Sequence, residues 1–353
     1  MRVAALEHRL PAARGAALAL LAAVLFGIST PLVQLAGSGV GPFATAALLY
    51  AGAALIGALL RRPVGREAAL RRSDLRRLAW MAFFGAGVGP VALAWGLQHT
   101  SGTSASLMLA LEALFTALLA RALYHEVMDR RVWTAMALLL AGGVVLIVDR
   151  GTAPGVQAMG LLAVFAATFA WGVDNTLSRS LAERDPAQVV FGKAVLGAAA
   201  TAAIALASGE VLPSRGSAIA LLAIGASGYG LSLRLYLLAQ RAFGAARTGS
   251  VFAFAPFIGA LLAIVLGDRS LTLGMAVGGL LMLAGVALHL SESHIHEHEH
   301  ELLDHEHAHT HDDGHHDHTH DPMPPGPHSH RHVHLPMHHA HSHVPDAHHG
   351  HHH

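Results

Sequence analysis

The stretch Leu111–Ile147, LEALFTALLARALYHEVMDRRVWTAMALLLAGGVVLI, decides the fold of this chain because it occurs twice. The second copy, Phe254–Leu290, reads FAPFIGALLAIVLGDRSLTLGMAVGGLLMLAGVALHL and aligns with the first without a gap. The constant offset is 143 positions, the difference between 254 and 111. Self-similarity at one fixed offset is typical of a duplicated architecture. We therefore predict a chain built from two copies of one membrane unit.

The composition indicates a membrane protein. Of the 353 residues, 53% are hydrophobic and 13% are charged, and the mean hydropathy is +0.46, whereas soluble domains carry about a quarter charged residues. The net charge is zero, so no overall field indicates a nucleic-acid partner, and without cysteine the chain has no disulfides or thiolate metal sites. No nucleophile–base pair or phosphate-binding loop appears, so we predict that the chain is not an enzyme.

Apolar segments of about 20 residues, the length that crosses a bilayer, recur along the chain. Only helices satisfy every backbone polar group in lipid without a partner strand. We therefore predict an all-α membrane protein with ten transmembrane helices, numbered helix 1 to helix 10 in chain order. Their expected bounds are Gly15–Leu35, Pro42–Leu60, Leu78–Leu97, Thr103–Leu123, Val132–Val148, Val156–Leu177, Ala187–Ser208, Ala218–Leu238, Ala245–Leu266 and Thr272–Leu290.

The arginines of the short loops alternate between the two sides of the membrane. One side holds Arg61, Arg62, Arg66, Arg71, Arg72, Arg76, Arg77, Arg121, Arg130, Arg131, Arg179, Arg184, Arg241 and Arg247. The other side holds only Arg150, Arg215 and Arg269. Because positive loops stay inside, we predict a multi-pass protein of the inner or plasma membrane with both termini in the cytoplasm.

Five helices per copy is an odd number, so the second copy enters the membrane inverted. Inverted repeats are a frequent plan of secondary transporters, which place the substrate site near the midplane between the two halves. The predicted parts are an N-terminal segment (1–14), a first repeat (15–150), a second repeat (151–290) and a C-terminal tail (291–353).

Glycines recur inside several predicted spans, including Gly85, Gly142 and Gly225. We interpret most of them as sites of close packing, because small side chains let helices approach one another in lipid. Gly89–Pro90 and Pro256 are the predicted hinges for alternating access, because a proline leaves a backbone carbonyl without its helical donor.

Four short stretches, taken in order, resemble a known family. They are FGISTPL at Phe26–Leu32, LEALFTALLA at Leu111–Ala120, WGVDN at Trp171–Asn175 and APFIGA at Ala255–Ala260. Together with the repeat, they are similar to EamA-type members of the drug/metabolite transporter superfamily over about residues 15–290. The resemblance implies a carrier that exports or exchanges small metabolites, amino acids or drugs, without naming the cargo.

Four charged residues lie within the predicted spans: Glu112, Asp174, Lys193 and Arg234. Each costs at least about 2.5 kcal/mol at a helix centre and needs a partner or a water-filled cavity. Two acids and two bases suit mutual pairing, so one interpretation is two structural ion pairs that hold the halves in register. The other is a polar site for cargo and a coupling ion where the repeats meet.

Glu112 is the leading candidate because leucines and alanines surround it, and we expect it to bind a cationic group or a coupling proton. Asp174 and Lys193, in neighbouring helices, are expected to form an ion pair. Arg234 suits a carboxylate or phosphate of the cargo, unless its long side chain reaches the membrane surface. The predicted substrate and coupling residues are Glu112, Asp174, Asn175, Lys193, Arg234, Tyr50 and Trp95.

Nearly all 29 histidines follow Ser293, in a segment with several prolines and few apolar residues. Such a segment cannot bury a core, so we predict that the tail is disordered. Imidazole suits zinc, nickel, cobalt and copper(II), and we predict that the tail binds such ions, although a low-complexity tail without a metal role is the alternative. The predicted ligands are His294, His296, His298, His300, His305, His307, His309, His311, His315, His316, His318 and His320.

Three functions remain open on the sequence. The first is an exporter of a small organic solute in the lipid bilayer, driven by a proton or other gradient and requiring no cofactor. The second is a transition-metal exporter whose tail collects ions. The third is a membrane-anchored metal buffer, which would have no use for charges inside the spans.

Overall fold

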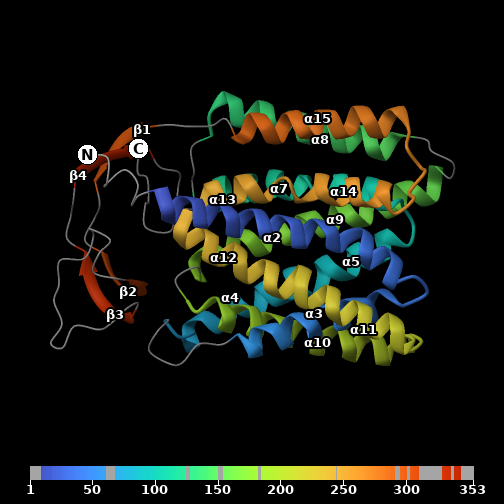
Figure 1. Ribbon diagram of the computed structural model, residues 1–353, viewed down its shortest axis with the longest axis horizontal. Coiled ribbons are helices and arrows are strands. Elements are labelled where there is room, and N and C mark those ends of the chain that lie inside the picture. Colours follow the sequence, from blue (N-terminus) through green and yellow to red (C-terminus); the bar gives the residue numbers. More distant parts are fainter. Residues whose placement is uncertain are drawn as a thin grey trace.

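The computed structural model describes the helical bundle almost completely and parts of the tail. The residues described are 9–60, 68–124, 128–149, 154–181, 184–243, 245–290, 295–299, 303–309, 328–334 and 338–342. Within them, all ten predicted helices are present and pack side by side as one bundle (Figure 1). The all-α membrane fold is therefore confirmed.

Six of the ten helices are continuous, and the other four are each interrupted by an irregular segment. Helices 1, 2, 5, 6, 7 and 10 are α2 (Arg9–Ala36), α3 (Pro42–Leu59), α8 (Arg130–Val148), α9 (Pro154–Ser178), α10 (Pro186–Ala207) and α15 (Leu273–Leu290). Helices 3, 4, 8 and 9 are α4 (Leu75–Met81) with α5 (Gly89–Leu97), α6 (Gly102–Met108) with α7 (Leu111–Tyr124), α11 (Arg215–Ile224) with α12 (Ser232–Phe243), and α13 (Ala245–Phe252) with α14 (Ala255–Val265).

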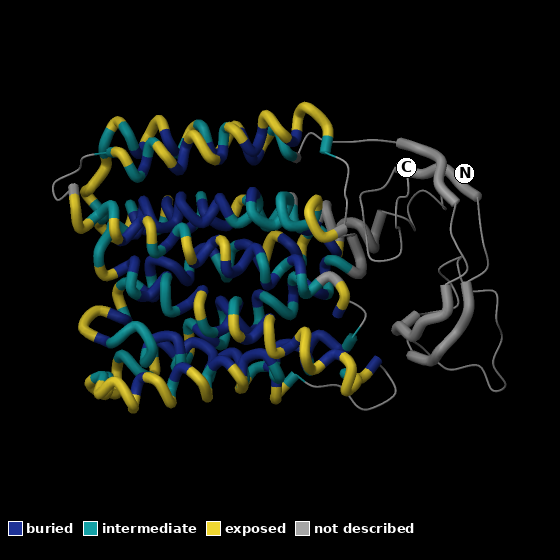
Figure 2. The backbone as a smooth tube through the Cα atoms, turned by 180° about the vertical axis from the view of Figure 1, so that it is seen from behind, coloured by how far each residue is buried: buried dark blue, intermediate teal, exposed yellow. Residues whose placement is uncertain are grey.

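The outer surface of the bundle is apolar, as lipid requires. Figure 2 shows exposed positions along the outward faces of the helices and buried ones between them, and Leu59, Leu206 and Val265 are among the large apolar residues exposed to the outside. Eight helices of the described chain are long and apolar enough to span a membrane, while Ala255–Val265 and Leu273–His289 are shorter apolar helices. A bundle with an apolar exterior and buried polar groups is the arrangement that a bilayer selects.

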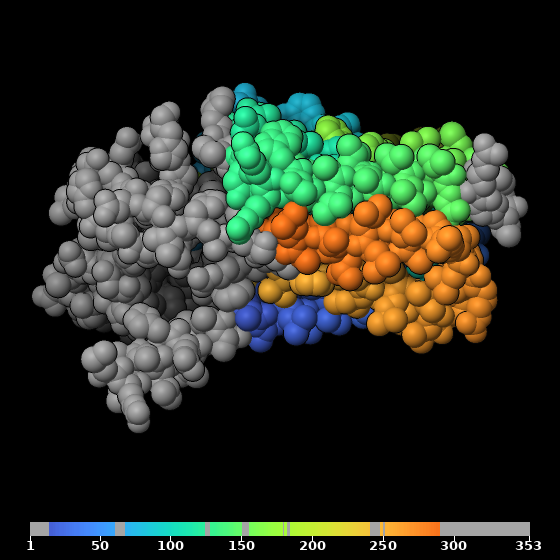
Figure 3. All heavy atoms as spheres, turned by 90° about the horizontal axis from the view of Figure 1, so that it is seen from above, coloured from blue at the N-terminus to red at the C-terminus, as the bar shows by residue number. Residues whose placement is uncertain are grey.

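The helix packing is symmetrical: the main contacts between helices have equivalent contacts when the two repeats are exchanged. Helix 2 packs against helix 7 (α3 and α10) and helix 5 against helix 10 (α8 and α15), so equivalent helices meet as pairs; Figure 3 shows α8 and α15 side by side on one face. Helix 1 packs against helices 8 and 9, and helix 6 packs correspondingly against helices 3 and 4. This pseudo-two-fold arrangement is that of two inverted repeats, as the sequence predicted.

Glycines at the contact between α8 and α15 show the same symmetry in atomic detail. A Cβ atom at Gly142 would lie 2.7 Å from the backbone oxygen of Gly278, and one at Gly285 would lie 2.8 Å from that of Ala135. Each residue of the second contact is related to one of the first by the 143-residue offset. These glycines therefore allow close helix packing, as predicted from their small size.

The irregular parts of the helices also recur at the repeat offset. A π-helical segment joins α4 to α5 at Ala82–Val88, and another joins α11 to α12 at Gly225–Leu231, which is 143 positions further on. Helices 4 and 9 are interrupted just before Leu111 and Ala255, respectively. The first π segment directly precedes the predicted hinge at Gly89–Pro90, and π segments are frequent at functional sites.

The two ends of the bundle differ. At the end where α2 and α4 begin and α15 ends (Figure 1), the loops carry most of the arginines, and we call it the arginine-rich end. At the opposite, arginine-poor end, carboxylates of the second repeat cap helices of the first. Glu210 accepts hydrogen bonds from Ala44 N at 2.7 Å, and Asp268 accepts them from Thr103 N at 2.9 Å and from Thr103 Oγ1 at 2.7 Å.

Four short strands occur in the tail, where the sequence predicted disorder. They are β1 (Ile295–Glu299), β2 (Leu303–His309), β3 (His328–His334) and β4 (His338–Ser342), and β1 pairs antiparallel with β4 and β2 with β3 (Figure 1). Histidine alternates with other residues in β1, β2 and β3, and a period of two is the pattern of a strand. The remainder of the tail lies outside the described residues.

Candidate functional site

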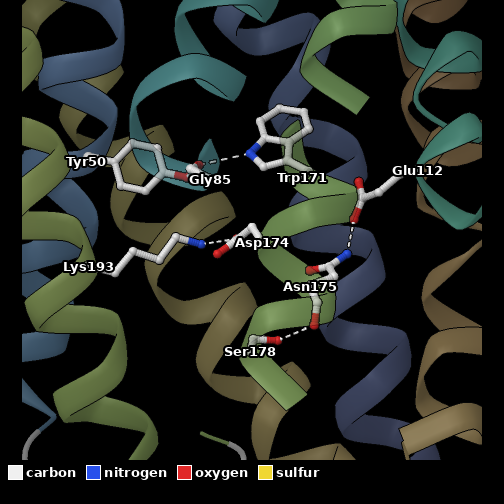
Figure 4. Close-up of polar contacts among 8 residues, drawn as sticks. All are labelled: Tyr50, Gly85, Glu112, Trp171, Asp174, Asn175, Ser178 and Lys193. Atoms are coloured by element: carbon white, nitrogen blue, oxygen red, sulfur yellow. Dashed lines mark hydrogen bonds and ion pairs between the residues drawn. The ribbon is translucent and has the colours of Figure 1, made fainter. Parts of the chain in front are cut away.

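The candidate site is organised around helix α9, which presents two successive polar residues to two different neighbours. Figure 4 shows Asp174 directed towards Lys193 of α10, and Asn175 directed to the other side of α9, towards Glu112 of α7. Successive residues of a helix point about 100° apart, so one helix serves both sides. Together with Tyr50, which reaches the same region from α3, the structure brings together five of the seven predicted residues, from both repeats.

Asp174 and Lys193 form the buried ion pair that the sequence predicted. Their side chains are almost fully buried, at 7% and 5% exposure, and Lys193 Nζ donates to Asp174 Oδ2. The second oxygen, Asp174 Oδ1, has no hydrogen-bond partner among the described residues. A Cβ atom at Gly85 would lie 2.3 Å from the Asp174 carboxyl carbon, so the carboxylate occupies the space that a side chain at position 85 would need.

The backbone carbonyl of Gly85 is the second element of the site. In a π-helix this oxygen would accept from the N–H five residues further on, but that residue is Pro90, which has no N–H. The released carbonyl instead accepts hydrogen bonds from Tyr50 Oη and, at 3.0 Å, from Trp171 Nε1. The oxygen thereby joins helices 2, 3 and 6 (Figure 4).

Glu112 is held by an amide rather than by a cation. Asn175 Nδ2 donates to Glu112 Oε1 at 2.5 Å, and both side chains are half-buried. Glu112 lies in the first turn of α7, immediately after the interruption of helix 4, where the positive end of the helix dipole stabilises a carboxylate. The equivalent position of the second repeat is Ala255, so only one of the two interrupted helices carries this charge.

An aromatic cluster that the sequence analysis did not predict lies between the two repeats. The ring of Phe26 lies 5.9 Å from those of Trp171 and Tyr229 and 5.3 Å from that of Phe252, and Tyr50 lies 5.7 Å from Tyr229. Most of these contacts are edge-to-face, the geometry that aromatic pairs prefer. The sequence analysis did not predict the contact between Phe26 and Trp171.

The site also obeys the pseudo-two-fold symmetry. Gly228 is the repeat equivalent of Gly85, and a Cβ atom there would lie 2.6 Å from Ser29 Cβ. Ser29 therefore holds in the first repeat the place that Asp174 holds in the second. The backbone of the site is symmetrical, whereas its charges are not.

Two predicted residues lie elsewhere. Trp95 stacks on His99 with ring centroids 4.0 Å apart. It lies ten residues beyond Gly85 and thus roughly 15 Å further along the helix. The tryptophan that belongs to the site is Trp171, not Trp95. Arg234 is half-buried in the first turn of α12. The predicted metal ligands belong to the tail, whose side chains lie outside the described part of the structure.

A bundle of two inverted five-helix repeats, with charged groups enclosed where the repeats meet, defines a membrane transporter. The chain belongs to the EamA-like transporter family, whose model matches residues 13–148 and 158–291 and thus both repeats. Proteins of this family are carriers of the drug/metabolite transporter type and not enzymes.

Two known proteins are similar to the chain. An uncharacterized transporter of Methanothermobacter thermautotrophicus (strain Delta H) is 26% identical over 289 residues, covering 75% of this chain and 82% of the relative. A solved crystal structure with 24% identity matches with a TM-score of 0.57, covering 77% of this chain and 94% of the other. The solved structure is similar in fold.

Proposed function

We propose that the chain is an alternating-access secondary transporter that exports a small organic metabolite or drug-like solute, with both termini in the cytoplasm. The observation that carries the proposal is the bond between Glu112 and Asn175, placed where the two repeats meet and at the interruption of helix 4. Transporters of this plan bind cargo and coupling ions at such interrupted helices.

Glu112 is the group we expect to change its partner during transport. An amide is a neutral donor, and a hydrogen bond to an ionised group is stronger when the donor is charged. A proton or a cationic group of the cargo therefore competes effectively with Asn175 for the Glu112 carboxylate. Asp174 is already paired with Lys193, so Glu112 is the better candidate for coupling.

The tail supports transition-metal export as the second candidate function. Its histidines would collect zinc, nickel, cobalt or copper(II) at the mouth of the transporter. A metal path also needs ligands inside the bundle, and the described residues hold no cluster of three or more His, Cys, Asp or Glu side chains. We therefore rank metal export below organic-solute export, and a membrane-anchored metal buffer third, because it would not need the enclosed charges.

The test compares the metabolites exported by cells that express the wild-type chain with those exported by the Glu112→Gln variant. We expect at least one small organic solute to leave the cells faster with the wild type and to lose this advantage in the variant. Glu210→Gln is the matched control, because it removes a carboxylate that caps α3 outside the site. Glu112-dependent tolerance of nickel, cobalt or zinc, without any exported organic solute, would replace the proposal by metal export.

A further inference from the structure

The net charge of zero conceals two parts of opposite charge. Residues 1–290 contain 22 lysines and arginines against 12 acidic residues, an excess of ten positive charges. Residues 291–353 contain 11 acidic residues against one arginine, Arg331, an excess of ten negative charges with histidine counted as neutral. The membrane bundle and the tail therefore carry equal and opposite charges.

The positive excess of the bundle lies at one end. The charges of the arginine-poor end cancel, and so do those within the spans. At the arginine-poor end, three acidic residues balance three arginines: Asp149, Glu210 and Asp268 against Arg150, Arg215 and Arg269. Within the spans, two acidic residues balance two basic ones: Glu112 and Asp174 against Lys193 and Arg234. All ten excess positive charges consequently belong to the loops and the N-terminal segment at the arginine-rich end.

At that end, arginines face outward while described acidic residues are engaged in the fold. Asp74 Oδ2 binds Arg184 Nε at 2.9 Å, Asp129 caps α8 through Val132 N at 2.8 Å, and Asp185 Oδ1 accepts from Ala187 N at 2.9 Å at the start of α10. The exposed arginines include Arg72, Arg76, Arg77, Arg130 and Arg131. The exposed face of this end is thus strongly cationic.

The tail starts at the same end of the bundle. Helix α15 ends at Leu290 on the side where α4 begins (Figure 1). As a flexible chain, the following 63 residues would span roughly 45 Å, enough to reach every loop of that end. Within the β2–β3 pair, Arg331 stands opposite Glu306 in the register. With one arginine against 11 acidic residues, the tail does not balance its own charge.

We propose that the acidic tail, residues 291–353, docks on the arginine-rich end of its own bundle. An arginine excess on one side is common to membrane proteins and serves their orientation, so the excess alone does not indicate a binding partner. The matching negative charge of the tail at the same end does indicate one, because a tethered segment meets this surface at an effective concentration in the millimolar range. Anionic lipid headgroups are the competing occupant.

The test uses the absence of cysteine to place one reporter on the docking surface. Ser73→Cys lies between Arg72 and Asp74 and is exposed; Leu212→Cys, exposed at the arginine-poor end, is the matched control. The full chain is placed in phosphatidylcholine nanodiscs at low salt, and the rate of maleimide labelling is measured. We expect replacement of the 11 tail carboxylates by amides to speed labelling of Ser73→Cys severalfold, and labelling of Leu212→Cys to stay unchanged.

Two further arms separate charge from other causes. High salt should also speed labelling at position 73, because it screens exposed charges. With the wild-type tail, Arg72→Gln with Arg76→Gln should match the effect of the neutral tail, whereas Arg215→Gln with Arg269→Gln should not. Equal labelling rates for charged and neutral tails overturn the proposal, and so does protection that appears only when the nanodiscs contain anionic phosphatidylglycerol. Neither arm requires a cargo, so the result is independent of the transport proposal.

Discussion

At the scale of single residues, the site depends on one residue without a side chain and one residue without a backbone N–H donor. Gly85 has no Cβ atom where the Asp174 carboxylate lies, and Pro90 has no N–H for the Gly85 carbonyl. The first absence makes room for the buried ion pair, and the second frees an oxygen for Tyr50 and Trp171. The cluster that joins the repeats therefore depends partly on two residues that contribute no polar side chain.

Gly85→Ala should accordingly damage the site, because its Cβ atom would lie 2.3 Å from the Asp174 carboxyl. We expect the Asp174–Lys193 pair to be displaced and stability to fall by about 1–3 kcal/mol, as for other overpacked cores. Gly87→Ala is the control in the same π segment, since its nearest neighbour would be at 3.6 Å. Thermal unfolding in detergent measures both, and equal melting temperatures for the two variants would contradict the assignment.

The charged residues of the site were predictable, whereas its neutral groups were not. Glu112, Asp174 and Lys193 stand out because a charge within an apolar segment requires a partner, and the pairing of the last two followed from their places on adjacent helices. The partner of Glu112 did not, because an asparagine in a membrane helix has many uses. Likewise, Pro90 signals a released carbonyl, but sequence spacing does not say which tyrosine or tryptophan from another helix will reach it.

At the scale of helices, apolar composition located every span but not its internal irregularities. Hydropathy measures how favourably a segment partitions into lipid, and an α-helical and a π-helical segment of the same composition have the same hydropathy. The π segments Ala82–Val88 and Gly225–Leu231 therefore lie inside spans predicted as uniform helices. Their recurrence at the repeat offset indicates that they belong to the duplicated unit.

A cap between the repeats offers a test at this scale. Burial raises the pKa of the Asp268 carboxyl, but hydrogen bonds from Ser270 and Thr103 outweigh it and hold the pKa below its ordinary value of 3.8. Because the folded-state pKa is the lower one, the carboxylate stabilises the fold fully above pH 3.8, and this contribution is lost as the pH falls through the folded-state pKa.

Asp268→Asn should therefore lower stability by about 1 kcal/mol at pH 7, because hydrogen bonds to a charged acceptor are replaced by weaker bonds to a neutral one. The melting temperatures of the variant and the wild type should converge in acid, once the wild-type carboxyl is protonated. Arg269→Gln alters the neighbouring charge and is the control, for which we expect no pH-dependent difference. A gap between Asp268→Asn and wild type that is as wide at pH 3 as at pH 7 would exclude the carboxylate as its cause.

At the scale of the molecule, the repeat offset relates structural features of the first repeat to matching features of the second. The π segments, the glycine contacts between α8 and α15, and the places of Gly85 and Gly228 all recur 143 positions apart. The symmetry was predictable, because an ungapped alignment of two stretches is visible in the sequence. The charges of the site do not follow this symmetry, because Glu112 corresponds to Ala255 in the second repeat.

Inversion makes a demand on the loops that single-cysteine labelling can check, because the chain has no cysteine of its own. Ser73 and Gly216 are repeat equivalents, and so are Met128 and Leu271. If the second unit crosses the membrane upside down, each member of a pair must face the compartment opposite to that of its equivalent. We expect an impermeant maleimide to reach Ser73→Cys and Met128→Cys only from one side of the membrane and Gly216→Cys and Leu271→Cys only from the other. Labelling of two equivalents from the same side would mean that the repeats run parallel, and the pairing of Glu112 with Asn175 across a two-fold interface would then lose its structural basis.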